Sequence, residues 1–295
     1  MTTDSTMNVG IGLPSTIPGV TGRLVLDWAR TAEQAGFSTL GTLDRLVYGN
    51  LETVPTLAAA AAVTERIGLT TAVMIGPYRG NGALLAKQLA TVDNIAGGRL
   101  TVGIAVGARE DDFEATASPY AGRGKAFDAQ LAELHAVWAG EPRGFAGPIG
   151  PAPVRPGGPP LLIGGNAPAT FRRVTEFGAG WIMGAGGPDA FAAAAGDVRQ
   201  AWRAAGRDGE PRLVAIGYAS LGADAEEHAR RYLGDYYGFV GDYVERVIGS
   251  ALTTPEAVAD AVARFGAAGC DELILFPCNP DTDQVELIAD AAGLR

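Results

Sequence analysis

The segment from residue 97 to residue 113, GGRLTVGIAVGAREDDF, decides the fold of this chain. Its residues 100–106 form a short apolar run that ends at Gly107, where a cluster of charged residues begins. Near-continuous apolar runs of this length are typical of strands that are buried on both faces of a parallel sheet. Parallel α/β proteins carry their chemistry at the C-terminal ends of such strands. The segment therefore predicts a core strand followed by a functional loop.

The same pattern repeats along the chain. Further apolar segments, each ending in glycine, proline or charged residues, predict strands at 7–13, 38–43, 69–75, 161–164, 180–183, 213–219 and 272–276. Apolar residues at helical spacing, and helix-start signals, predict helices at 23–35, 55–66, 123–139, 167–177 and 283–292, with others ending near residues 95 and 205, starting near 224 and opening at 254–255. Residues 140–160 are rich in proline and glycine and predict a long surface connection.

Eight strands that alternate with helices predict a (β/α)₈ TIM barrel. The 295 residues fit one such domain, which we expect at 7–295 after a loose N-terminal tail at 1–6. The alternative is a doubly wound open sheet. Its dinucleotide-binding fingerprint needs a helix after the first strand, but Pro14 follows Gly10–Leu13 there and blocks the helix entry.

Composition limits the class of partner. The formal net charge of −10 arises from 23 Lys and Arg against 33 Asp and Glu, without a basic block, so nucleic acid is not expected as a partner. No apolar stretch approaches the roughly 20 residues of a membrane-spanning helix, and the N-terminus lacks the features of a signal peptide. We therefore expect a cytoplasmic protein without a membrane partner.

The cysteines and histidines do not form a metal-binding pattern. Cys270 and Cys278 flank one predicted strand, which separates them too far for a disulfide, and we expect reduced thiols. His135 and His228 lie in predicted helices without a Cys or His at metal-ligand spacing, so no metal is expected. Since no histidine follows a strand, a Ser–His or Cys–His mechanism has no base, and a bound cofactor is expected to carry the chemistry.

In a barrel the strand ends meet at one mouth, which makes their polar residues the candidates for function. These are Asp44, Arg45, Tyr78, Arg79, Arg109, Glu110, Asp111, Gly165 and Asn166, with Phe276 and Cys278 at the last strand. Other interpretations stay open. Asp44 would equally serve as a loop cap, and residues 110–112 as the solvated first turn of a short helix. The aromatic segment 232–247 would form either a lid over the mouth or ordinary packing.

Several motifs occur together in the order found in one known family. They are Asp44-Arg45 after the second strand, the segments 97–100 and 102–112, the helix 123–140, and Ala268-Gly-Cys-Asp-Glu-Leu273 near the end. With these motifs, nearly the whole chain resembles the bacterial luciferase-like family. The resemblance implies a TIM barrel, usually a homodimer, that binds FMN or coenzyme F420 at its C-terminal mouth. It also implies hydride transfer between that cofactor and a small organic substrate.

The resemblance also assigns roles by position. Asp44 would face the deazaflavin ring, and Ala72-Val73 would form a strand bulge whose non-prolyl cis peptide bond backs the ring. Residues 107–109 and 165–167 would hold the phosphate end of the cofactor tail. The expected catalytic residues are Asp44, Arg45 and Glu110; the expected cofactor-binding residues are Asp44, Ala72, Val73, Val106, Gly107, Ala108, Arg109, Gly164, Gly165, Asn166 and Ala167.

Two positions depart from the family pattern. Arg45 stands where several F420-dependent dehydrogenases carry a histidine, and it remains protonated, so it is no general base. Val106 stands where FMN-dependent members carry an arginine for the FMN phosphate, which favours F420. The alternatives are an FMN-dependent monooxygenase and a non-catalytic flavin-binding protein. If Asp44 contacts the ring, Asp44→Asn should weaken cofactor binding and barely change stability.

Overall fold

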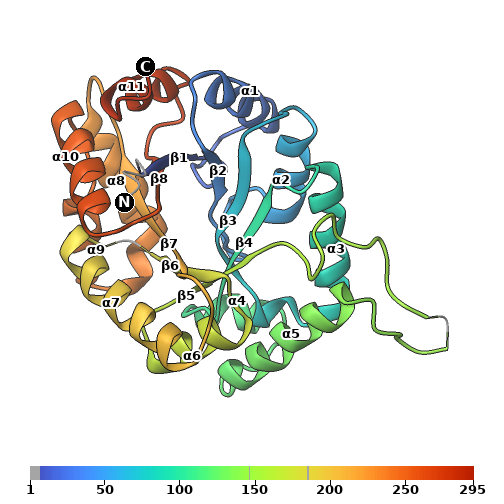
Figure 1. Cartoon of the computed structure of the whole chain (residues 1–295). Coiled ribbons are helices and arrows are strands. Elements are labelled where there is room, and N and C mark those ends of the chain that lie inside the picture. Colours follow the sequence, from blue (N-terminus) through green and yellow to red (C-terminus); the bar gives the residue numbers. More distant parts are fainter. Residues whose placement is uncertain (1–6, 146, 185) are drawn as a thin grey trace.

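The strands close into a single barrel. The computed structural model describes residues 7–145, 147–184 and 186–295, and the expected tail at 1–6 lies outside them. Eight parallel strands pair in the order β1 to β8, and β8 pairs back to β1 (Figure 1). This closure confirms the TIM barrel and excludes the open doubly wound sheet.

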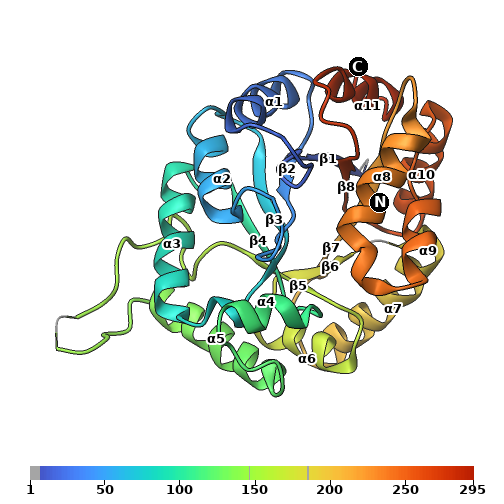
Figure 2. The ribbon, with the colours of Figure 1, turned by 180° about the vertical axis from the view of Figure 1, so that it is seen from behind.

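Helices surround the strands in both ribbon views (Figures 1 and 2). The strands are β1 Asn8–Gly12, β2 Thr39–Thr42, β3 Gly68–Ile75, β4 Leu100–Ala105, β5 Leu161–Gly164, β6 Gly180–Met183, β7 Arg212–Ala219 and β8 Glu272–Pro277. The α-helices are α1 Gly22–Gln34, α2 Thr53–Ala61, α3 Gly82–Ile95, α4 Glu110–Ala115, α5 Arg123–Trp138, α6 Pro168–Phe177, α7 Pro188–Ala204, α8 Ala225–Tyr237, α9 Tyr243–Gly249, α10 Pro255–Ala267 and α11 Asp283–Ala291. Two short 3₁₀ helices are η1 Pro77–Arg79 and η2 Gly238–Val240.

The prediction for α2 was wrong at both ends. The helix begins two residues before Pro55, because the side chain of Glu52 accepts a hydrogen bond from the backbone N–H of Val54 and caps it. It ends at Ala61 instead of Arg66. The carboxylate of Glu33 accepts hydrogen bonds from the N–H groups of residues 65–67, which therefore lead into β3 instead of continuing the helix.

The core has two parts. Apolar side chains between the strands and the helices form the larger one, which includes Trp28 and Trp181. The smaller one fills the barrel interior and continues into α8 through Tyr232 and Tyr236. Near the top of the barrel the ring of Phe276 lies against Gly12, where a Cβ atom would stand 2.1 Å from it. The interior is therefore packed at this level of the barrel.

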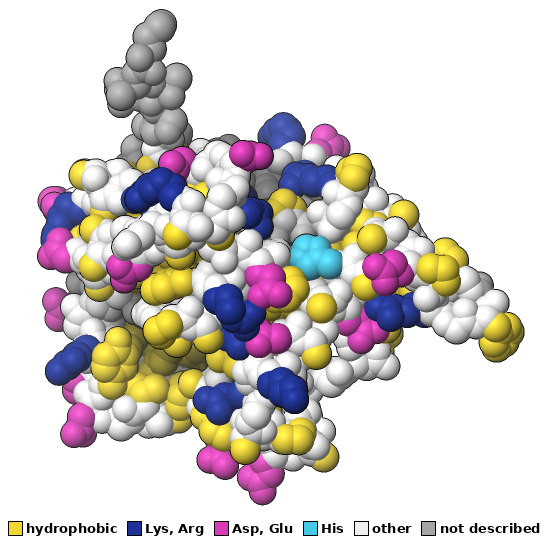
Figure 3. All heavy atoms as spheres, turned by 60° about the horizontal axis from the view of Figure 1, so that its bottom comes forward, with side chains coloured by type: hydrophobic (Ala, Val, Ile, Leu, Met, Phe, Trp, Pro, Cys, Tyr) yellow, Lys and Arg dark blue, Asp and Glu magenta, His cyan; other side chains and the backbone are white. Residues whose placement is uncertain are grey.

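The surface connection between α5 and β5 is confirmed. It carries one isolated bridge, between Pro142 and Pro148, and projects from the ring of helices in Figures 1 and 2. On the face drawn in Figure 3, acidic and basic side chains are interspersed. Among the described residues, no helix has both the length and the apolar character needed to cross a membrane. Cys270 and Cys278 are buried free thiols, as expected.

Candidate functional site

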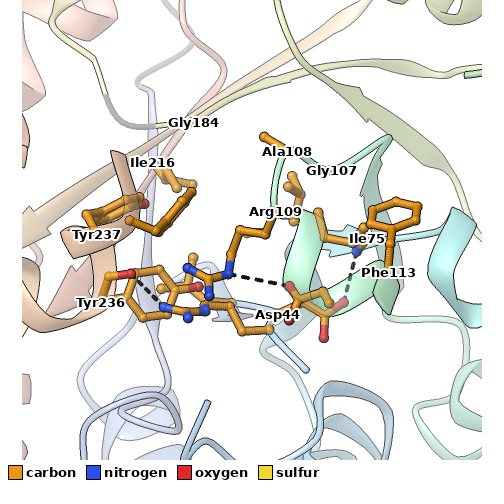
Figure 4. A pocket seen from close by; sticks show the side chains of 16 residues that line it. Asp44, Ile75, Gly107, Ala108, Arg109, Phe113, Gly184, Ile216, Tyr236 and Tyr237 are labelled. Atoms are coloured by element: carbon orange, nitrogen blue, oxygen red, sulfur yellow. Dashed lines mark hydrogen bonds and ion pairs between the residues drawn. The ribbon is translucent and has the colours of Figure 1, made fainter. Parts of the chain in front are cut away.

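A cavity of about 170 Å³ opens at the C-terminal mouth of the barrel. Its wall combines the ends of β2, β3 and β4 with β7, α4, α8 and η2. The lining residues are Leu43, Asp44, Arg45, Ala72, Val73, Ile75, Gly107, Ala108, Arg109, Asp112, Phe113, Gly184, Ile216, Tyr236, Tyr237 and Phe239. Figure 4 shows Arg109 between Tyr237 on one side and Phe113 on the other. Strand ends that are far apart in the sequence thus form one site.

Asp44 is held on all sides by protein donors. Its Oδ2 accepts hydrogen bonds from the N–H of Ile75 at 2.9 Å and from the hydroxyl of Tyr78 at 2.7 Å. Its Oδ1 accepts from Arg79 at 2.9 Å and lies 3.2 Å from the hydroxyl of Thr53. A carboxylate offers about four acceptor positions. The Thr53 hydroxyl has one proton and also lies 3.0 Å from the carbonyl of Leu43. Although Asp44 lines the cavity, protein groups thus occupy at least three of these positions, and its carboxylate joins the end of β2 to η1.

Because of this network we expect Asp44→Asn to lower stability, in place of the small change expected from the sequence. The side chain of Asp44 is 2% exposed and that of Arg79 14%, so the pair is buried. Burial alone would lower the pKa of Arg79, but the charges of Asp44, Tyr78 and Glu52 outweigh it and raise the pKa. Burial and the charge of Asp44 raise the pKa of Tyr78, so its hydroxyl stays protonated and donates. Removing the charge of Asp44 disrupts this network.

The guanidinium of Arg45 lies among backbone carbonyls and aromatic rings. Its Nη1 donates to the carbonyl of Tyr236 at 2.6 Å and its Nη2 to the carbonyl of Val47 at 3.2 Å. The guanidinium carbon lies 4.4 Å from the ring centroid of Tyr48 and 5.6 Å from that of Phe239, both within cation–π range. Within the described residues, its Nε finds no hydrogen-bond partner. Burial, and then the charge of Arg109, lower the pKa of Arg45.

Arg109 approaches the cavity from the loop after β4. It forms an ion pair with Asp111 and lies 3.8 Å from the carboxylate of Asp112. Its guanidinium carbon lies 4.2 Å from the ring centroid of Phe239. Arg45 and Arg109 therefore flank the same aromatic ring.

The interpretation of residues 110–112 as a solvated turn holds for Glu110 but is wrong for Asp112. Asp112 is buried, and its Oδ1 accepts hydrogen bonds from the N–H groups of Leu46 and Val47. It therefore stabilises the loop after β2. Glu110 is exposed at the first turn of α4 and lies outside the cavity wall, so the structure does not bring this expected catalytic residue to the site.

The predicted bulge in the third strand is confirmed. The pairing of β3 with β4 changes register between Thr71 and Met74, and the Ala72–Val73 peptide bond is cis. Both residues line the cavity. Their role in backing a cofactor ring stays a prediction.

The expected tail-binding residues divide into two groups. Gly107, Ala108 and Arg109 line the cavity, whereas Val106 packs against the core and residues 164–167 lie beyond the wall. Gly107 has a φ of 78°, and a Cβ atom there would meet Ile75 at 2.5 Å, so the loop requires glycine. Among the described residues, no backbone carbonyl accepts from the N–H groups of Gly107, Ala108, Gly165 or Asn166. These groups are available to an anion at the edge of the mouth.

Sequence reasoning missed part of the wall. Phe113, Gly184 and Ile216 were not candidates, because nothing in the local sequence separates them from ordinary core or loop residues. Phe276 and Cys278, which were candidates, are buried in the barrel core and do not line the cavity.

The packing interpretation of the aromatic segment is confirmed for one part of it, whereas another part lines the cavity; the lid stays a prediction. Tyr232 packs inside and exchanges a hydrogen bond with Thr16, while Tyr236, Tyr237 and Phe239 face the cavity. Burial raises the pKa of Tyr237 to about 12, so this hydroxyl is neutral at physiological pH. The segment therefore contributes an uncharged aromatic wall to the mouth.

One family model matches most of the chain. The model of the luciferase-like monooxygenase family matches residues 7–269. An uncharacterized protein of Mycobacterium tuberculosis is 30% identical over 191 residues, which are 55% of this chain and 65% of that protein. The match therefore spans less than two thirds of that relative's length.

Two solved structures resemble the chain over nearly its full length. An F420-dependent secondary alcohol dehydrogenase, in complex with an F420–acetone adduct, has a TM-score of 0.81 at 18% identity and covers 98% of this chain and 99% of its own. The FMN-bound oxygenating constituent of 3,6-diketocamphane monooxygenase from Pseudomonas putida has a TM-score of 0.74 at 17% identity and covers 97% and 98%. At these identities the similarity establishes a shared fold.

Proposed function

Because the chain belongs to the luciferase-like monooxygenase family, we propose that it is an oxidoreductase that binds coenzyme F420 in the mouth of the barrel and transfers hydride between F420 and a small organic substrate. The composition of the cavity wall carries this proposal. Among the described residues that line the cavity, none is a histidine or a cysteine. The Ser–His and Cys–His pairs of nucleophilic enzymes are thus lacking there, and a bound cofactor would carry the chemistry.

The residues of the mouth fit such a cofactor. The apolar side chains of Ala72, Val73 and Ile75 form one wall, against which a planar ring would pack. The N–H groups of Gly107 and Ala108, together with those of residues 165–166, would hold the anionic tail. When bound, F420 supplies a ring carbon that accepts or donates hydride.

The protein's own residues would position the reactants and exclude water. Asp44 fixes Ile75 and Tyr78, and so keeps the β3 wall in place. Phe113 and Tyr237 narrow the mouth from opposite sides (Figure 4). Positioning of this kind contributes to rate without a catalytic histidine. We also propose that the enzyme is a homodimer, which light scattering of the purified protein will test.

Val106 supports F420 over FMN. The resemblance places an arginine for the FMN phosphate at this position, whereas Val106 packs against the core. The nearby Arg109 is already engaged by Asp111 and Phe239. A cation dedicated to a terminal phosphate is therefore missing from the end of β4.

Fluorescence titration of the purified protein with F420 and with FMN tests the choice of cofactor. We expect F420 to bind at least about tenfold more tightly, a difference of about 1.4 kcal/mol. Tighter binding of FMN, followed by oxygen-dependent turnover, would indicate an FMN-dependent monooxygenase instead. Tight binding with no reduction or oxidation by a broad panel of donors and acceptors would indicate a non-catalytic flavin-binding protein.

Gly184→Trp tests whether this cavity is the cofactor site. Gly184 lines the cavity, and a Cβ atom there would meet nothing within 4 Å, so the protein should fold with the indole in the mouth. Steric conflict should weaken F420 binding by about ten- to hundredfold. The matched control is Gly196→Trp on the exposed side of α7, where a Cβ atom also has free space. Equal affinities of the two variants would move the cofactor out of this cavity.

A further inference from the structure

The guanidinium of Arg45 is a buried cation without a carboxylate partner. The residue is 8% exposed, and its hydrogen bonds go to two backbone carbonyls, those of Tyr236 and Val47. Within the part of the chain that the structure describes, no carboxylate lies within 4.0 Å of it, and its Nε makes no hydrogen bond. Since Arg45 lines the cavity, its guanidinium lies beside the place of a ligand.

The other charges in the cavity wall are already compensated. Asp44 pairs with Arg79, which lies behind the wall. Asp112 accepts two backbone N–H groups and lies beside Arg109, which also pairs with Asp111. The Nε of Arg109 also makes no hydrogen bond among the described residues, but that guanidinium pairs with Asp111. Arg45 is thus the cation of the described wall that lacks a carboxylate partner.

A buried charge is costly unless it is paired, and a guanidinium pairs best with a planar oxyanion through parallel hydrogen bonds. We propose that the cavity takes substrates that carry a carboxylate, and that Arg45 binds this group. This inference rests on the proposed function, because it names the substrate class of the same site. Arg45 is then a specificity-determining residue.

The walls near Arg45 indicate the rest of the substrate. Phe239 contacts the guanidinium, and Ile216 and Tyr237 continue the same surface. These side chains favour an apolar or aromatic body attached to the carboxylate. The site therefore suits a small organic acid.

The alternative to a substrate carboxylate as the ligand of Arg45 is an anionic group of the cofactor. The N–H groups of residues 165–166 proposed for the cofactor tail follow β5, three strands from β2 in the barrel order, whereas Gly107 and Ala108 precede Arg109, which flanks the same ring as Arg45. Because backbone N–H groups already provide for the tail, we assign the substrate carboxylate to Arg45, and titration in the presence of F420 tests this choice.

Binding of simple acids to cofactor-free protein tests the proposal. The probes are benzoate and acetate, with benzamide as the neutral match of benzoate, and their binding is measured by saturation-transfer NMR and calorimetry. We expect benzoate to bind at least about tenfold more tightly than benzamide. Arg45→Gln should weaken benzoate binding by about ten- to hundredfold and leave benzamide unchanged, whereas Arg45→Lys should restore part of the affinity.

Two controls separate this role from a structural one. Arg230→Gln removes an exposed arginine whose partner is Glu245, and it should not change benzoate binding. Circular dichroism and thermal melting verify that each Arg45 variant is folded. Equal binding of benzoate and benzamide, no binding of either acid, or benzoate binding that survives Arg45→Gln would each overturn the proposal.

A final experiment repeats the benzoate titration on protein that is saturated with F420. Undiminished benzoate affinity supports a substrate carboxylate at Arg45, whereas displacement of benzoate by F420 would assign Arg45 to the cofactor and overturn the proposal. If the protein does not bind F420, the proposed function fails, but the titrations on cofactor-free protein still decide the role of Arg45.

Discussion

Asp44→Asn is expected to reduce the free energy of unfolding by about 3 kcal/mol, the lower end of the range for breaking a buried ion pair. The substitution leaves Arg79 with one carboxylate partner, Glu52. It also sets an amide N–H₂ group against donors, since Ile75 and Tyr78 both donate to this side chain. Thermal and denaturant unfolding of the cofactor-free protein measure the loss, which corresponds to a fall in melting temperature of roughly 5–10 °C.

Asp27→Asn is the matched control. Asp27 is also held by two arginines, Arg23 and Arg30, but its side chain is 43% exposed on α1. Exposed pairs of this kind contribute little to stability, so the melting temperature of Asp27→Asn should barely change. If Asp44→Asn melts like Asp27→Asn and loses only cofactor affinity, the carboxylate serves the cofactor directly and the network described here is unimportant for stability.

Gly103→Ala is expected to destabilise the protein by about 3 kcal/mol and also to impair cofactor binding. A Cβ atom at Gly103 in β4 would stand 2.1 Å from the carbonyl oxygen of Thr71, which begins the bulge in β3. This contact is with backbone, so the strand itself must move. Because Ala72 and Val73 follow directly and line the cavity, the displacement reaches the proposed ring-binding wall.

Gly180→Ala is the control that separates the loss of stability from the loss of cofactor binding. A Cβ atom at Gly180 would stand 1.9 Å from the carbonyl oxygen of Arg212, at the start of β6 and away from the mouth. Gly180→Ala should therefore lower the free energy of unfolding about as much as Gly103→Ala does. Its folded fraction should bind F420 with the affinity of the wild type. Urea unfolding and F420 titration of both variants provide the comparison. Equal F420 affinities would show that the bulge does not form part of the cofactor site.

Much of the fold was predictable from local patterns. The apolar runs and their glycine or proline stops indicated every strand of the barrel, because such patterns depend on residues within a few positions of each other. Helix ends were less accurate. The end of α2 depends on Glu33, whose carboxylate binds residues 65–67 from another helix, and no local signal reveals that contact.

The sequence by itself determined the barrel and, through the family resemblance, the bulge at Ala72–Val73, and it predicted the mouth as the place of function. Only the tertiary structure decided what each polar residue does there. Arg45 meets the carbonyl of Tyr236, which lies 191 positions away, and Asp112 binds a loop 65 and 66 positions before it. Partners so distant meet only when the barrel closes, so burial, pairing and the missing counter-charge of Arg45 are properties of the closed fold.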